Sequence, residues 1–195
     1  MKKITIDDIK DLTTYEIERP GFRREIIALK KVRRVPLGDR VSIVFENRKT
    51  VLFQIQEMLR AERIVLPEKV QEEIDVYNEL IPPPDHLSAT LFIEIREQAR
   101  IKEYLDAFLG LDQGERIYFE MDGATRSVAR FEAGRSKEDR ISAVHYLQFP
   151  FEGEVREKFL DPALPAHLVI DHPNYQARTT ISPALRQSLI EDLTA

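Results

Sequence analysis

The histidine at position 145 is the residue best suited to acid–base chemistry. Apolar residues alternate with polar ones around it, namely Ile141, Ala143, Leu147 and Phe149. This period of two is typical of a strand with one face on the core. An imidazole on that face needs a hydrogen-bond partner. We therefore expect His145 to be either a hydrogen-bonded core residue, which we favour, or a catalytic general base.

Two arginines that follow an Asp-Gly turn are candidates for binding an anion. Arg126 and Arg130 lie on the expected return strand of this hairpin. Guanidinium groups bind carboxylates and phosphates through paired hydrogen bonds. An enzyme could use His145 as its base and Arg126 or Arg130 as a clamp on a small anionic substrate. The alternative, which we favour, is a solvated strand face balanced by Glu120 and Glu132.

Basic residues are concentrated in the segment 19–40, which holds eight basic residues and two acidic ones, whereas the whole chain has a net charge of −5. The last four on its helical part are Lys30, Lys31, Arg33 and Arg34. Cations also suit the C-terminal end of a helix, and no aromatic residues interleave with them to stack on bases. We expect an acidic protein partner and no nucleic acid. Glu57 and Arg60, on the next helix, are either further contacts or ordinary surface pairs.

The four histidines do not predict a local metal site. None is four residues from another, and His167 and His172, five apart, would point to opposite faces of a strand. The chain has no cysteine, so thiolate ligands, disulfides and a cysteine nucleophile are excluded. It also lacks the glycine-rich motifs that bind phosphates or dinucleotides. We expect no metal and no cofactor, although distant segments could still assemble a metal site.

Helical spacing of apolar residues dominates the first part of the chain. A helix is expected over residues 21–34, because Pro20-Gly21 should end the helix before it. Its buried stripe would consist of Phe22, Ile26, Leu29 and Val32, with the basic residues pointing outward. Further helices are expected over residues 49–63 and from Pro67 to the triple proline at 82–84. Residues 41–45 suggest a strand buried on both faces.

Strand patterns dominate the second part. The expected strands cover residues 87–95, 117–121, 124–132, 141–149, 167–171 and 176–181. Helices are expected over residues 97–109 and 153–160 and from Pro183 onward. The order of elements predicts an α+β fold, with a mainly helical part (1–84) packed on a mainly antiparallel sheet (85–195) in one compact domain.

The composition is that of a soluble protein. A third of the residues are charged (32%), and no apolar run approaches the roughly 20 residues of a membrane helix. The residues after Met1 do not form a signal peptide. We therefore expect a cytoplasmic location.

Several runs of this sequence resemble a bacterial family known only as domain-of-unknown-function (DUF) family 3501. The runs are Ile27-Ala28-Leu29-Lys30-Lys31, Phe45-Glu46-Asn47-Arg48, residues 54–63, Tyr77-Asn78-Glu79-Leu80-Ile81-Pro82 and residues 87–95. The resemblance covers nearly the whole chain and supplies no catalytic residues. It implies an accessory role in redox metabolism, because genes of that family often lie near those of rubrerythrin-like and iron–sulfur oxidoreductases.

We therefore expect an uncharacterised accessory or binding protein that docks on a redox partner. The alternative is an enzyme that acts on a small anionic substrate through His145 and an arginine clamp. A concave pocket shared by His145, an arginine and a carboxylate would favour the enzyme.

Overall fold

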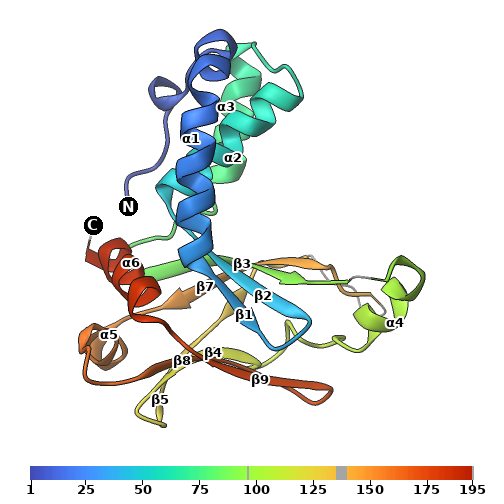
Figure 1. Cartoon of the computed structure of the whole chain (residues 1–195), viewed down its shortest axis with the longest axis vertical. Coiled ribbons are helices and arrows are strands. Elements are labelled where there is room, and N and C mark those ends of the chain that lie inside the picture. The colour runs from blue at the N-terminus through green and yellow to red at the C-terminus, as the bar shows by residue number, and fades with distance from the viewer. Residues whose placement is uncertain (96, 135–139, 195) are drawn as a thin grey trace.

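A helical arm stands on two antiparallel sheets in the computed structural model, which describes residues 1–95, 97–134 and 140–194 (Figure 1). The arm consists of η1 (Ile6–Asp8), α1 (Leu12–Arg33), α2 (Arg48–Ala61) and α3 (Pro67–Asn78). Side chains cap its two longest helices: Asp11 accepts hydrogen bonds from the first turn of α1, and Asn47 does so for α2. Valine, isoleucine and leucine side chains of α2 and α3 form a separate small core inside the arm.

The remaining elements build the sheets and cover them. The five-stranded sheet has the order β1 (Arg34–Leu37), β2 (Val41–Glu46), β3 (His86–Ile93), β7 (Val144–Pro150) and β6 (Arg130–Phe131). The four-stranded sheet has the order β5 (Thr125–Val128), β4 (Ile117–Met121), β8 (Ala166–His172) and β9 (Tyr175–Thr180). The other helices are η2 (Gln98–Arg100), α4 (Ile101–Asp106), α5 (Gly153–Leu160) and α6 (Pro183–Thr194). None of the helices in these described ranges is long and apolar enough to cross a membrane.

The main core lies between the two sheets. Phe119 of β4 packs against Phe45 of β2 and Phe149 of β7, with ring centroids 5.6 and 5.0 Å apart. Aromatic rings at these distances add to the stabilisation from burying their apolar surface. Alternate residues of β2, β3 and β7 point into this core, so the residues between them face outward. The outer face of the five-stranded sheet is therefore free to carry polar side chains.

The predicted α+β class is confirmed. The helix expected over 49–63 is α2, the helix expected from Pro67 is α3, and the C-terminal helix starts at Pro183. The strand expected to be buried on both faces is β2. The mainly helical part of the chain also contributes two strands to the five-stranded sheet: β1 pairs with β2, and β2 pairs with β3.

The expectation that a helix ends at Pro20-Gly21 is wrong, because α1 continues through Pro20. A proline inside a helix loses one backbone hydrogen bond. Residues on both sides of Pro20 contact α2, which holds this part of α1 in place. Arg19 pairs with Glu57 at 2.7 Å, and the ring of Phe22 packs edge-on against Phe53 at 5.4 Å.

The buried stripe of α1 is also rotated from the predicted one. Val32, expected in the stripe, is 41% exposed, and the neighbouring Arg33 is fully buried. Arg33 is seven residues after the buried Ile26, which is two helical turns. The expectation that the basic residues of this helix all point outward is therefore wrong for Arg33.

Candidate functional site

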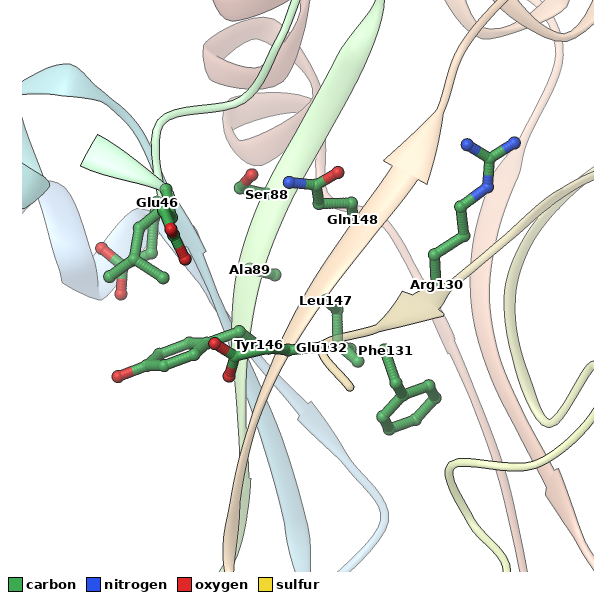
Figure 2. Close-up of a pocket in the computed structure, with 11 residues that line it drawn as sticks. Glu46, Ser88, Ala89, Arg130, Phe131, Glu132, Tyr146, Leu147 and Gln148 are labelled. Carbon is green, nitrogen blue, oxygen red and sulfur yellow. The ribbon is translucent and has the colours of Figure 1, made fainter. Parts of the chain in front are cut away.

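A row of four polar residues crosses the outer face of the five-stranded sheet. The strand register places Glu46 of β2 opposite Ser88 of β3, Ser88 opposite Gln148 of β7, and Gln148 opposite Arg130 of β6. Directly opposed residues share one face of a sheet. Figure 2 shows Glu46 and Arg130 at opposite ends of this row, with Ser88 and Gln148 between them. We call this set the polar row.

The polar row lines a cavity of about 210 Å³ between the arm and the sheet. The other lining residues are Glu79, Leu80, Ala89, Phe131, Glu132, Tyr146 and Leu147. Glu79 caps the C-terminal end of α3. The backbone N–H of Glu132 donates to the carbonyl of Tyr146 at 3.1 Å, which fixes these two residues side by side. We call this space the arm–sheet cavity.

Glu46 is a buried carboxylate whose neighbours come from three elements. Its side chain is 3% exposed. One oxygen accepts a hydrogen bond from Thr90 and the other from Gln54, both at 3.1 Å. The ammonium group of Lys30 on α1 lies 3.7 Å from the same carboxylate. Burial of a charge is tolerated when it is paired and hydrogen-bonded in this way.

Ser88 is buried and has an unsatisfied hydroxyl. It is only 4% exposed, and its Oγ has no hydrogen-bond partner among the residues that the structure describes. Buried hydroxyl groups nearly always have a partner, because a missing hydrogen bond costs free energy. Ser88 therefore brings to the cavity wall a polar atom that the described part of the chain leaves without a partner.

The lining of the arm–sheet cavity carries an excess of negative charge. Glu46, Glu79 and Glu132 contribute carboxylates and Arg130 contributes one guanidinium, while Lys30 compensates Glu46 from outside the lining. Leu80, Phe131 and neighbouring aliphatic side chains supply apolar wall. Such a mixture of apolar wall and few polar groups is typical of small-molecule sites.

The structure does not bring His145 into this cavity. His145 is 1% exposed and faces the core side of β7, while its neighbours Tyr146 and Gln148 face or line the cavity. Its Nε2 lies 2.8 Å from the carbonyl oxygen of Ser142, and its ring packs edge-on against Phe131 at 5.5 Å. His145 therefore lies on the core face of its strand, as the sequence pattern predicts, and is enclosed by protein.

Arg126 and Arg130 lie in different sheets. The expected single return strand is divided into β5 and β6, and the backbone N–H of Ala129 between them bonds to Ile117 of β4. Arg126 stays on the four-stranded sheet, 3.7 Å from Glu120 and with its guanidinium 4.2 Å from the ring centre of Tyr118. Arg130 crosses to the other sheet and lines the cavity. The expectation of a single strand over residues 124–132 is therefore wrong.

The residues expected to bind a partner make contacts within the chain. Arg33 donates to the carbonyls of Phe45 and Glu46 and to Ser188, and it pairs with Asp192. Arg34 donates to Ser42 at 2.7 Å and lies 3.4 Å from Glu94. Of this group, Lys31 is exposed on α1, and Lys30 is partly exposed beside Glu46.

Glu57 and Arg60 join α2 to α1. Glu57 accepts two hydrogen bonds from Arg19, both at 2.7 Å, and one from Tyr15 at 2.8 Å. The bond from Arg19 holds the pKa of Glu57 below its ordinary value. Arg60 donates to Glu16 at 2.6 Å. Both residues therefore stabilise the arm from within.

The histidines lie apart from one another. Like His145, each of the other three has a ring nitrogen next to an oxygen: His86 at Pro84, His167 at Thr180 and His172 at Leu109. In the described part of the chain, no three histidine, aspartate or glutamate residues are arranged to hold a metal ion.

Sequence reasoning missed most of the polar row. Glu46, Ser88 and Gln148 lie on strands whose apolar residues dominated the pattern, and only Arg130 was expected at a site. One signal was available. Glu46, Glu79 and Ser88 all belong to the runs that carry the family resemblance.

Comparison with known proteins agrees with that resemblance. A family model described as "Protein of unknown function (DUF3501)" matches residues 3–193. A crystal structure of a novel protein of unknown function from Burkholderia pseudomallei is similar over 98% of this chain and 100% of that chain, with 30% sequence identity and a TM-score of 0.89. No curated protein matches the sequence.

Proposed function

The chain belongs to the DUF3501 family, whose function is unknown, and we propose that it is a binding protein whose arm–sheet cavity takes a small polar molecule with a cationic amino group. The observation that carries this proposal is the hydroxyl of Ser88, which is buried in the cavity wall beside Gln148 and Glu46 and has no hydrogen-bond partner among the described residues. A ligand hydrogen bond to this hydroxyl would remove the cost of leaving it unsatisfied.

The charge of the cavity supports a cationic ligand. Three carboxylates line it against one guanidinium, and the ammonium group of Lys30 lies 3.7 Å from one of them, Glu46. An ammonium group donates up to three hydrogen bonds and has no acceptor, which suits a wall rich in oxygen atoms. A volume of about 210 Å³ restricts the ligand to small metabolites.

Titration calorimetry with matched amines and carboxylates tests the proposal. Butylamine and putrescine are the cationic probes, and butyrate and succinate are anions of similar size. We expect the amines to bind and the carboxylates not to bind. Ser88→Ala and Glu46→Gln should each weaken amine binding by about tenfold, as expected for the loss of a hydrogen bond to a charged group.

A second buried serine on the same face provides the control. Ser42 is 2% exposed and its hydroxyl already accepts a hydrogen bond from Arg34, so Ser42→Ala should leave amine binding unchanged. Binding of the carboxylates in place of the amines, or equal binding by wild type and Ser88→Ala, would show that the proposal is wrong.

The enzyme alternative has less support from the geometry. His145 lies outside the lining of the cavity, and Arg126 and Arg130 are on different sheets. Docking on a redox protein stays a prediction that follows from the family resemblance. The arm–sheet cavity neither supports nor contradicts that prediction.

A further inference from the structure

One face of α1 lines a groove at the β1 edge of the five-stranded sheet. Six of its lining residues belong to α1 and its C-terminal cap and recur at intervals of three or four, so they lie on one helical face. They are Arg23, Ile26, Ile27, Lys30, Lys31 and Arg34. The other lining residues are Phe53 of α2, Pro36 of β1, Ser42 of β2 and Glu94. The groove measures about 560 Å³. We call it the α1 groove.

The α1 groove combines apolar and basic surface. Ile27 is 51% exposed, although it is a large aliphatic residue, and it lies in the lining with Phe53 and Pro36. An exposed apolar surface with a polar rim is typical of a site that another molecule covers.

The groove is strongly basic in an acidic protein. Four cations line it against one carboxylate, Glu94, which lies 3.4 Å from Arg34. Across the described ranges of the chain, no carboxylate comes within ion-pair distance of Arg23 or Lys31. Because the whole chain carries a net charge of −5, this local excess of positive charge would attract an acidic partner to one place.

We propose that the α1 groove docks an acidic amphipathic segment of a partner protein. Apolar side chains of the segment would pack on Ile27 and Phe53, and its carboxylates would pair with Arg23 and Lys31. Recognition of an amphipathic helix by an apolar groove with charges at its rim is a common mode of peptide binding. An anionic membrane fits less well, since the rest of an acidic protein would be repelled from it.

This docking site occupies a different part of the sheet from the arm–sheet cavity. The cavity lies over β3, β7 and β6, whereas the groove lies beside β1 at the other edge of the sheet. Lys30 stands between them, lining the groove and lying 3.7 Å from Glu46. A partner and a small ligand could therefore be bound at the same time.

Fluorescence anisotropy with a labelled synthetic peptide tests the proposal. The peptide has glutamate and leucine at helical spacing, and the same peptide with lysine in place of glutamate is the control ligand. We expect the acidic peptide to bind, to bind more weakly as salt increases, and the basic peptide not to bind. Lys31→Glu and Arg23→Glu should each weaken binding by about tenfold or more. Ile27→Gln should also weaken peptide binding, but the dependence of the affinity on salt concentration should stay as in the wild type.

Arg24→Glu is the matched control, because Arg24 is an exposed residue of the same helix that does not line the groove. It makes the same change of charge and should alter the affinity less than twofold. The proposal is overturned if the acidic peptide does not bind, or if Arg24→Glu weakens it as much as Lys31→Glu. Binding of anionic lipid vesicles or single-stranded DNA through Arg23 and Lys31, without peptide binding, would also overturn it.

Discussion

Two serines of the sheets, Ser88 and Ser127, are both buried but differ in whether the hydroxyl group makes a hydrogen bond. Ser88 and Ser127 are 4% and 1% exposed. Ser127 donates to the carbonyl of Pro150 at 2.6 Å, whereas the hydroxyl of Ser88 has no partner among the described residues. The same side chain therefore stabilises the fold at position 127 and costs free energy at position 88.

Substitution by alanine should separate the two serines. We expect Ser127→Ala to lower the free energy of unfolding by about 1 kcal/mol, the usual value of a hydrogen bond. Ser88→Ala should leave it unchanged or raise it by up to about 1 kcal/mol, because an unsatisfied polar group is removed. Urea unfolding at neutral pH measures both. An equal loss in the two variants would mean that Ser88 has a partner in solution.

Among the contacts between helices, the carboxylate of Glu57 on α2 makes the most hydrogen bonds to α1 that the described residues show. Glu57 receives both a bidentate contact from Arg19 and the hydroxyl of Tyr15. Paired hydrogen bonds between guanidinium and carboxylate are the strong, orienting kind. They hold the pKa of Glu57 below its ordinary value of 4.5, and burial raises the pKa of Tyr15. The arm should therefore be sensitive to the protonation of Glu57.

Glu57→Gln should destabilise the protein in a pH-dependent way. The folded pKa lies below the unfolded value, so the stabilisation is complete above about pH 4.5 and is lost as the pH falls through the folded pKa. We expect a loss of about 1–3 kcal/mol at pH 7, which becomes smaller below pH 4.5. Urea unfolding across this range checks it, with Glu62→Gln as a control at an exposed position. A loss that does not vary with pH would contradict this account.

At the scale of the whole molecule, Arg33 joins the arm, the sheet and the C-terminal helix. It ends α1, donates to two carbonyls of β2, and contacts Ser188 and Asp192 of α6. Figure 1 shows α6 beside the base of α1, where these three parts meet. Burial raises the pKa of Asp192, and the charge of Arg33 opposes this shift.

Removal of Arg33 should therefore affect the stability of the whole protein. Arg33→Met leaves Asp192 buried without its cation, and we expect a loss of about 3–5 kcal/mol in the free energy of unfolding. Arg24→Met, at an exposed position of the same helix, should change it by less than about 0.5 kcal/mol. Thermal and urea unfolding compare the two variants. Similar stability of both would mean that Arg33 is a surface cation, as its sequence context suggested.

Local sequence patterns were enough to predict the α+β class and most of the helices and strands. The apolar residues of α2 and α3 recur at the helical period, and those of β3 and β7 recur at the strand period. Asp122-Gly123 forms the turn between β4 and β5, where both residues have a positive φ. These signals are readable because they depend on neighbours within one element, which share a face whatever the rest of the chain does.

The combination of these elements into sites could not be predicted from local patterns. The polar row joins positions 46, 88, 130 and 148 through the strand order β2, β3, β7 and β6, and no local pattern encodes that order. Arg126 and Arg130 are close in sequence, yet the chain changes sheets between them. In the sequence Arg33 cannot be distinguished from its basic neighbours, but in the fold it is buried against α6. In each case the role of a side chain depends on partners from distant segments, whose positions follow from the packing of the complete fold.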